Sequence, residues 1–559
     1  MELVPASESG VTFINSVKET PLRSISTYDY MYNGGGVAMA DFNNDGLTDL
    51  FFTGNDVLNR IYLNEGNLVF RDVTEKAGVN GGKWYTGVTV VDINDDGWND
   101  LYLSCSGPDF RTRSTANELY VNNQDGTFSE RSHEFGIADN GLSTQSVFFD
   151  MDGDGDQDLF VLNHGWRNLA NQESEWLERY RTLPAGEQKR YCNSLYRNDN
   201  GAYIQVTNSQ VTADPGFGLG VAIADFNDDG RPDIYVCNDF FIPDRLFINY
   251  GQARFEEGLA DFTGHCSFYS MGCDAADINN DGLTDLCVLD MTPADHVRNK
   301  VMMASMNVPL FEYMTETLNY LPQYMFNTLL LNRGYGLMSD IGQLAGVHQT
   351  DWSWAPLLSD FDNDGWKDLY VTNGFYRDVK NNDWRMKLNT MMLEENAGPE
   401  VIFEHLMSAD QTPVPNVMYH NTNGLQFENV SVQWNMARPS FSNGAAYGDL
   451  DNDGDLDLAV NNLDEEAFIY RNLASDSGDR HYIQVSLKST DPKYDPHDAV
   501  VNVYTGGQMQ SAAFRFNRGY QSHMQERIHV GLGSQTEIDS VVVVWKRGIS
   551  SVWQHPEPD

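Results

Sequence analysis

The pattern D-x-[DN]-x-D-G-x-x-D occurs seven times in the 559 residues, and each copy lies between two short apolar runs. The copies start at Asp41, Asp92, Asp150, Asp225, Asp277, Asp360 and Asp449. Three or more carboxylates within nine residues repel one another unless a cation holds them together. One copy already indicates a divalent-cation loop, and seven copies indicate that the cation is part of the architecture.

The spacing of the oxygen donors suits Ca²⁺. Side chains at positions 1, 3 and 5 alternate along the loop, position 7 offers its backbone carbonyl, and Asp at position 9 completes the shell. Position 6 is glycine in every copy, as a tight turn with positive φ requires. An EF-hand needs Glu at position 12 and flanking helices, whereas position 12 is apolar here in every copy. We therefore predict about seven Ca²⁺ ions per chain.

The predicted metal ligands are the residues at positions 1, 3, 5, 7 and 9 of each copy. An Asp- and Gly-rich surface turn without a metal is the alternative interpretation of any single copy. In chain order the predicted ligands are Asp41, Asn43, Asp45, Leu47 and Asp49; Asp92, Asn94, Asp96, Trp98 and Asp100; Asp150, Asp152, Asp154, Asp156 and Asp158; Asp225, Asn227, Asp229, Arg231 and Asp233; Asp277, Asn279, Asp281, Leu283 and Asp285; Asp360, Asp362, Asp364, Trp366 and Asp368; Asp449, Asp451, Asp453, Asp455 and Asp457.

The segments around the loops predict strands. Runs of four to five residues rich in Val, Phe, Tyr and small residues precede and follow each copy, such as GVAMA before the first and LFFTG after it. A second hairpin follows most copies, with an apolar strand that ends in Asn and a glycine-containing turn. Two hairpins per repeat form a four-stranded antiparallel unit. Seven such units predict an all-β fold, a seven-bladed β-propeller whose closed ring removes free sheet edges.

The chain divides into two predicted domains. Residues 1–473 form the propeller, in which the segment Gly10–Val17 completes the seventh blade by pairing with the last repeat. Insertions at about 164–192, 291–326 and 377–412 have the apolar spacing of helices. After a polar linker at 474–480, residues 480–559 form a small β domain without metal loops. Because no finishing element precedes the final PEPD, we expect this domain to be truncated and the native chain to continue.

These repeats resemble FG-GAP/VCBS repeats, the type found in integrin α-subunit propellers. The stretch GYQSHMQERIHVGLGSQTEIDSVVVVWKRG resembles the ASPIC/UnbV domain, although the usual G-I-G-A-like start of that domain reads HDAVVNVY here. The combination resembles cartilage acidic protein and the large secreted bacterial VCBS-repeat proteins. The resemblance implies an exported, calcium-stabilised propeller, and it implies no general biochemical activity.

Composition constrains the partners. The formal net charge is −45, and 28 of the 81 acidic residues lie inside the seven loops. A chain this acidic repels nucleic acid and anionic membranes. The sequence contains no run of 18 apolar residues, so we predict no membrane-spanning helix. No signal sequence is visible, and we expect that the start of the chain is trimmed. Because weak calcium sites suit the extracellular space, we expect a secreted or outer-surface location. The six cysteines allow fifteen pairings, and spacing does not select among them.

Three functions are consistent with these features. The first is a binding or adhesion module for a glycan or protein partner at the cell surface, in which Trp84, Tyr85, Trp352 and Trp354 gather at the channel mouth and stack on a ligand. Packing between blades is the alternative role for these rings. The second function is a structural component of an extracellular assembly, with contacts through the helical insertions or the C-terminal domain. The third is a polysaccharide lyase or hydrolase. Since no G-x-S-x-G, H-E-x-x-H or P-loop motif occurs, we predict that the protein is not an enzyme.

Overall fold

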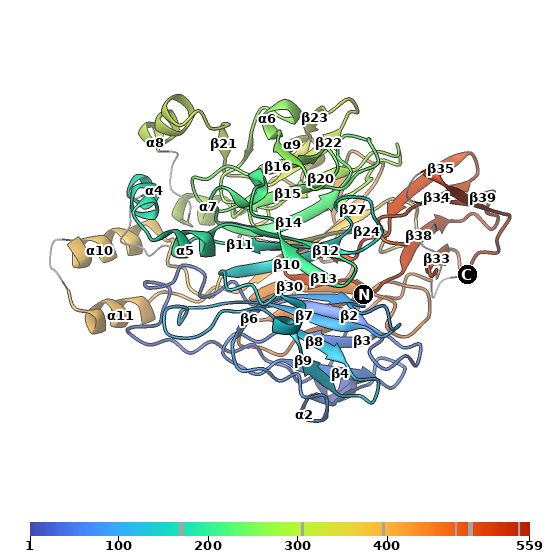
Figure 1. Cartoon of the computed structure of the whole chain (residues 1–559), viewed down its shortest axis with the longest axis horizontal. Coiled ribbons are helices and arrows are strands. Elements are labelled where there is room, and N and C mark those ends of the chain that lie inside the picture. The colour runs from blue at the N-terminus through green and yellow to red at the C-terminus, as the bar shows by residue number, and fades with distance from the viewer. Residues whose placement is uncertain (167–172, 303–306, 394–396, 476–477, 490–495, 546–547) are drawn as a thin grey trace.

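The protein is an all-β, seven-bladed β-propeller with a C-terminal β region (Figure 1). The computed structural model describes all residues except 167–172, 303–306, 394–396, 476–477, 490–495 and 546–547. Each of the seven blades contains four antiparallel strands that follow one another from the inside of the ring to the outside, and one copy of the nine-residue motif joins the first and second strand of every blade. In blade 1 two further short strands, β36 (Asn517–Arg518) and β37 (Ser522–His523), extend the sheet beyond its innermost strand. The innermost strands of consecutive blades contact one another around the whole ring, so the propeller is closed.

The strand bounds show how regular the repeat is. Blade 1 contains β2 (Val37–Ala40), β3 (Asp49–Phe52), β4 (Arg60–Asn64) and β5 (Phe70–Asp72); blade 2 contains β6 (Trp84–Val91), β7 (Asp100–Ser106), β8 (Glu118–Asn122) and β9 (Phe128–Glu130); blade 3 contains β10 (Ser143–Phe149), β11 (Asp158–Asn163), β12 (Ser194–Asp199) and β13 (Ala202–Gln205). Blade 4 contains β14 (Gly218–Ala224), β15 (Asp233–Asn238), β16 (Arg245–Asn249) and β17 (Phe255–Glu257); blade 5 contains β19 (Cys273–Ala276), β20 (Asp285–Val288), β22 (Thr328–Asn332) and β23 (Met338–Asp340). Blade 6 contains β24 (Ser353–Ser359), β25 (Asp368–Asn373), β27 (Val417–Asn421) and β28 (Phe427–Asn429); blade 7 contains β30 (Ser442–Gly448), β31 (Asp457–Asn462), β32 (Phe468–Arg471) and β1 (Glu2–Val4).

The N-terminus closes the ring, but not with the predicted segment. Strand β1 pairs with β32 and places Leu3 opposite Tyr470, whereas Gly10–Val17 forms only isolated bridges at Ile14 and Asn15. The prediction started one element too late. In other blades the fourth strand is followed by a one-turn helix that ends at a left-handed glycine, as α2 (Thr74–Ala77) ends at Gly78. Helix α1 (Ala6–Ser9) and Gly10 repeat this arrangement, so Gly10–Val17 corresponds to the connection after the fourth strand.

All three insertions contain helices in the parts that the structure describes. They are α4 (Glu173–Arg181) and α5 (Ala185–Gln188); α7 (His296–Met302), α8 (Val308–Glu312) and the π-helical turn Tyr313–Thr317; and α10 (Asn382–Leu393) and α11 (Pro399–Met407). Residues 167–172, 303–306 and 394–396 of the predicted insertions lie outside the described residues. Helices α4, α5, α8, α10 and α11 lie on the side of the propeller opposite the C-terminal strands (Figure 1).

The C-terminal region has its own small core. Strand β33 (His481–Val485) pairs with β38 (Ile528–Gly533), and a second sheet runs β35 (Gln508–Ala513), β34 (Val500–Thr505), β39 (Ser540–Val544) and β40 (Ser550–Gln554). Val501, Val503, Val543 and Trp545 pack between these strands. The region lies over the metal-loop face of the ring, where Gln484 Nε2 donates to Asp449 Oδ2 at 2.9 Å.

One stretch of this region, Arg515–Gln525, fills the centre of the ring, and we call it the axial segment. Its β37 (Ser522–His523) adds to the inner edge of β2, while the peptide oxygen of Gln521 accepts a hydrogen bond from Val88 N. The axial segment contacts inner-strand residues of all seven blades: Ala38, Val88, Gln145, Ile223, Asp274, Leu358 and Tyr447. The predicted linker therefore separates two cores, but a segment from beyond the linker completes the interior of the propeller.

The strongest axial contact is the ion pair between Arg518 and Asp274. Arg518 Nε and Nη2 lie 2.8 and 2.9 Å from the two carboxylate oxygens, and the Asp274 side chain is 1% exposed. We expect Arg518→Ala to lower the free energy of unfolding by about 3–5 kcal/mol, because it leaves a buried carboxylate without its counter-charge. Urea unfolding measures this effect.

The double variant Arg518→Ala/Asp274→Ala should lose less stability than Arg518→Ala alone, because it contains no unpaired buried charge. The exposed Arg113 offers a matched control, and Arg113→Ala should leave the unfolding midpoint unchanged. Equal effects at Arg518 and Arg113 would contradict the role assigned to the axial segment.

Candidate metal-binding loops

The seven loops share one backbone conformation. Position 4 has positive φ in every loop, with Asn, Asp or Gly at that place, and the glycine at position 6 has φ between 82° and 105°. The positive φ predicted at position 6 is confirmed in all seven loops. Two left-handed residues so close together curl the chain and turn successive backbone N–H groups toward the side chain at position 1.

Position 1 caps the turn. One carboxylate oxygen of this Asp accepts a hydrogen bond from the N–H of the position-6 glycine in every loop, at 2.7 to 3.1 Å. In six loops the other oxygen also accepts from the N–H of position 5. The loop is thus formed by its own side chain, and the carboxylate is held at the base of the turn.

Position 9 ties the loop to the blade. One oxygen of this buried Asp accepts from the N–H of position 2, and the other accepts from the N–H of the Asn that ends the third strand. The same pair of bonds occurs in all seven blades, with lengths from 2.7 to 3.2 Å. Each oxygen keeps a further lone pair that is available to a cation.

The Asn that ends the third strand was not predicted as a site residue. Its side-chain amide donates to the position-2 carbonyl of the neighbouring loop in six blades, as Asn122 does to Phe42 O at 2.9 Å. In blade 3 Asn198 instead donates to Gln157 O of its own loop. The signal was visible in the sequence, because the second hairpin of most repeats begins with an apolar strand that ends in Asn.

Carboxylates of one loop form a close group in three of the seven loops. In blades 3, 6 and 7 three carboxylates of one loop lie within 4.8 Å of one another; these groups are Asp150, Asp152 and Asp158; Asp360, Asp362 and Asp368; Asp449, Asp451 and Asp453. Asp152 Oδ1 and Asp451 Oδ1 are buried and have no hydrogen-bond partner among the described residues. Buried carboxylate oxygens without partners suit a hard cation that prefers oxygen ligands.

Side chains at position 7 take other partners, which is consistent with a role for the backbone carbonyl at that place. Arg231 pairs with Asp229 of its own loop, and Asp455 accepts hydrogen bonds from Ser475 and Asn363. Asp156 accepts from Asn200 N. Side chains at positions 1 and 3 lie together with position 9 in the loops of blades 3 and 6 and with position 5 in the loop of blade 7, whereas no position-7 side chain belongs to these groups. The full ligand set of each loop stays a prediction.

Burial and mutual repulsion disfavour the charged form of these carboxylates. Burial raises the pKa of Asp49 and Asp158 to about 8, and that of Asp100, Asp233 and Asp285 to about 7, with a further rise from carboxylates of the same loop. The backbone N–H bonds act in the opposite direction. A bound divalent cation stabilises the ionised form and so opposes this rise in pKa.

The aromatic residues predicted to form a recognition surface are buried. Trp84, Tyr85, Trp352 and Trp354 are 7%, 1%, 7% and 1% exposed. Trp354 packs against Tyr520 of the axial segment, and Trp352 stacks on Phe375 with ring centroids 3.7 Å apart. The proposed ligand-stacking role was wrong for this conformation, because the segments that surround the channel cover the rings.

Ser106 and His164 form the closest approach to a nucleophile–base pair. Ser106 Oγ lies 2.7 Å from His164 Nε2, but His164 Nδ1 bonds the carbonyl of Gly165 rather than a carboxylate. Both side chains are buried, and burial lowers the pKa of His164 to about 4. This pair is therefore inaccessible to a substrate. The six cysteines, all within described residues, are likewise buried and form no disulfide.

Two family models match separate regions of the chain. Residues 25–103, 109–161 and 185–236 match the FG-GAP-like repeat, and residues 490–559 match ASPIC and UnbV. Cartilage acidic protein 1 of Mus musculus and of Homo sapiens are each 27% identical over 194 residues, which is 31% of this chain and 29% and 28% of those proteins. The chain thus spans less than a third of the length of these curated relatives.

Two solved structures cover most of the chain at low similarity. An Agrocybe aegerita lectin that recognises non-reducing terminal N-acetylglucosamine has a TM-score of 0.39 and 14% identity, over 78% of this chain and 86% of its own. The exotype rhamnogalacturonan lyase YesX has a TM-score of 0.29 and 10% identity, over 79% of this chain and 90% of its own. Among the described residues, no helix is long and apolar enough to cross a membrane.

The raised pKa values give a pH prediction for the metal-free protein. Between the ordinary Asp value of 3.8 and about 8, the folded loops keep protons that the unfolded chain has released. The free energy of unfolding therefore falls as pH rises through this interval. We expect the urea midpoint of the metal-free protein to decrease from pH 5 to pH 8, and we expect added Ca²⁺ to reverse the slope.

Asp233→Asn tests whether the loops cause this dependence. The amide cannot ionise, so the slope should become shallower, and it accepts only one of the two backbone N–H bonds, so stability should fall by about 1–3 kcal/mol. Asp261 is exposed on a one-turn helix and offers a control. If Asp261→Asn changed the slope of the urea midpoint against pH as much as Asp233→Asn does, the pH dependence would come from the overall charge and not from the loops.

Proposed function

We propose that this protein, whose chain carries FG-GAP-like repeats and a C-terminal ASPIC and UnbV domain, is a calcium-stabilised binding module that engages a glycan or protein partner at the cell surface. The observation that carries the calcium part is the clustering of carboxylates in the loops of blades 3, 6 and 7, where three carboxylates lie within 4.8 Å of one another and where Asp152 Oδ1 and Asp451 Oδ1 have no hydrogen-bond partner among the described residues. Side chains at positions 1, 3, 5 and 9 hold the ion, and the position-7 carbonyl completes the shell.

The bound ion supplies positive charge that holds the carboxylates of each loop together. The protein residues do the rest: Asp at position 1 shapes the turn, and Asp at position 9 joins the loop to the third strand. Because the loops connect the inner two strands of every blade, their occupancy stabilises the whole ring. An ion that binds the folded chain and not the unfolded chain raises stability by mass action.

The proposed binding role rests on the outer surface of the propeller, which the C-terminal region leaves open to a partner. The axial segment occupies the centre of the ring, so a partner has to use the outer surface. Helices α7, α8, α10 and α11 expose apolar side chains there: Val297 is 67% exposed, Val308 55%, Met386 68% and Val401 48%. Large apolar side chains exposed on several helices of one side of the molecule are candidates for an interaction surface.

Two other functions remain alternatives. A structural component of an extracellular assembly would use the same insertions, or the C-terminal region, for contacts between copies, and it would form filaments or large particles in the presence of Ca²⁺. A polysaccharide lyase or hydrolase would need an accessible acid–base pair, and Ser106 with His164 does not supply one. Electron microscopy and an assay for newly formed sugar ends separate these outcomes from binding.

Metal analysis tests the calcium proposal. After dialysis against trace chelator the protein should contain several equivalents of calcium, up to about seven. Asp229→Ala, which removes the position-5 carboxylate of the fourth loop, should lower the count by one, while Asp261→Ala should not change it. A count near zero or one would contradict the architecture assigned to the loops.

Chelation should lower the melting temperature substantially, and Ca²⁺ rather than Mg²⁺ should restore it. Each loop offers four or five protein oxygens, which is more than the small octahedral Mg²⁺ ion accepts without giving up its waters. Equal recovery with the two ions would show that general screening of the −45 charge, and not coordination, stabilises the fold.

The partner proposal is tested with labelled protein on a glycan array and on cells of the source organism. Met386→Glu/Val401→Glu should lose binding while melting temperature and calcium content stay unchanged, because both side chains project from the propeller. Leu22→Glu is the matched control, since Leu22 is 81% exposed and lies outside the insertions. Retained binding in the double variant would place the contact on another surface.

A further inference from the structure

Within the seven repeats, the residue at position 3 of the loop is related to a residue on the third strand. Position 3 is Asn in four loops, and in those blades the residue before the strand-ending Asn is apolar: Leu63, Val121, Ile248 and Leu331. Position 3 is Asp in the other three loops, and there the corresponding residue is basic: Arg197, His420 and Arg471. The relation holds in all seven blades, so an Asp at position 3 is always accompanied by a basic residue type at this place on the third strand.

The register of the blade explains the relation. Because the N–H of the strand-ending Asn bonds the position-9 Asp, the residue before it lies at a fixed place beside the loop. Arg471 Nε lies 3.0 Å from Asp451 Oδ2, and its Nη2 lies 3.5 Å from Asp453 Oδ2. The basic side chain therefore contacts positions 3 and 5, which are two of the proposed calcium ligands.

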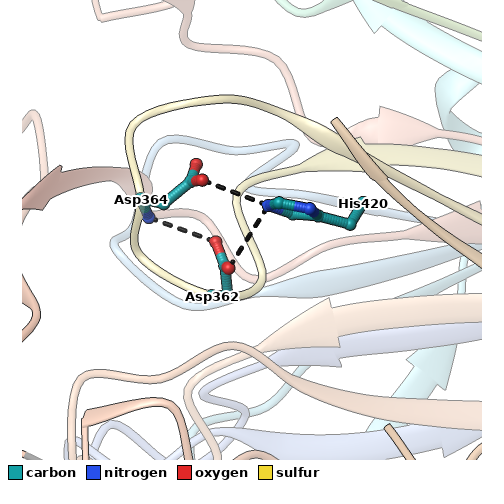
Figure 2. Close-up of side chains that lie close together, drawn as sticks. All are labelled: Asp362, Asp364 and His420. Carbon is teal, nitrogen blue, oxygen red and sulfur yellow. Dashed lines mark hydrogen bonds and ion pairs between the residues drawn. The ribbon is translucent and has the colours of Figure 1, made fainter. Parts of the chain in front are cut away.

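Blade 6 repeats this contact with a histidine. His420 Nε2 lies 3.1 Å from Asp364 Oδ2 and 3.5 Å from Asp362 Oδ2, so the imidazole faces the two carboxylates of the loop (Figure 2). In blade 3 Arg197 binds Asp199 with two bonds of 2.8 Å and acts on Asp152 only through its charge. Contact with the loop is thus direct in blades 6 and 7 and indirect in blade 3.

The environment of Asp451 shows what the cation does. The Asp451 side chain is 7% exposed; one oxygen lies against Arg471, and the other is buried without a hydrogen-bond partner among the described residues. Arg471 compensates one charge of the cluster and leaves one oxygen of Asp451 without a hydrogen-bond partner among the described residues. A calcium ion needs the oxygens at positions 3 and 5, and a positive guanidinium next to them repels it.

We infer that Arg471 is an internal counter-ion that stabilises the seventh loop when no ion is bound and opposes ion binding. This inference rests on the proposed calcium function. His420 occupies the corresponding place beside the sixth loop, and Arg231 pairs with the position-5 Asp of the fourth loop. The seventh loop keeps part of its charge compensation in the metal-free protein through Arg471, and it binds Ca²⁺ against a local positive charge.

Substitution of Arg471 tests the inference with the protein in full length. Arg471→Leu introduces the residue type found beside the Asn-containing loops. It should raise the calcium affinity of one site by about tenfold, measured by calorimetric titration in competition with a chelator of known affinity. It should also lower the urea midpoint of the metal-free protein, because the carboxylates of the seventh loop lose their counter-charge. Arg471→Lys keeps the charge and should behave as the unmodified protein in both measurements.

The reciprocal variant is Leu63→Arg in blade 1, where Asn43 occupies position 3 of the loop and Leu63 is partly exposed. It should lower the calcium affinity of one site without a gain in metal-free stability, because no fourth carboxylate is present to pair with the new cation. If Arg471→Leu folds poorly without calcium, this variant still tests the competition. Calcium bound with unchanged affinity in both variants would overturn the inference and leave the calcium proposal intact, whereas no bound calcium in any variant would refute the calcium proposal itself.

Discussion

The propeller depends on the pair of hydrogen bonds that the buried Asp at position 9 of each loop accepts from the backbone. The two oxygens of this Asp accept one N–H from the loop and one from the third strand, so a single side chain connects three strands of a blade. The strand-ending Asn then donates to the neighbouring loop in six blades, which carries the connection around the ring. Because both residues are buried, the loss of any of these hydrogen bonds leaves a buried polar group without a partner. The bonds therefore stabilise neighbouring loops together.

This arrangement places carboxylates close together, and the protein limits the resulting repulsion in three ways. Backbone N–H groups at the turn bond the Asp at position 1, basic side chains from the third strand accompany the fourth carboxylate, and the donor geometry suits a divalent ion. The first two are visible in the described residues. The third is the proposed ion, whose positive charge would compensate part of the 28 acidic residues that the loops contribute to a chain of net charge −45.

The axial segment changes what the propeller offers to a partner. An open channel would present the inner ends of the blades, but Tyr520, Gln521 and Arg518 occupy this space and use hydrogen-bonding groups of the inner strands. The inner edge of β2, which would otherwise be free, gains β37 as a neighbour. The axial segment therefore belongs to the propeller interior, and the proposed recognition role falls to the outer surface with its insertion helices.

Much of this structure followed from the sequence because the determinants are local. The nine-residue motif specifies its own turn through Gly at position 6 and Asp at position 1, and the number of copies specifies the number of blades. The closing strand was predicted too late in the chain, since Glu2–Val4 is a strand only through its pairing with β32, a contact about 470 residues away in sequence. Local sequence patterns did not predict the position of the axial segment, nor the burial of Trp84 and Trp354. Non-local packing decides them, because a three-residue strand or an aromatic side chain has no distinctive periodicity until its distant partner is in place.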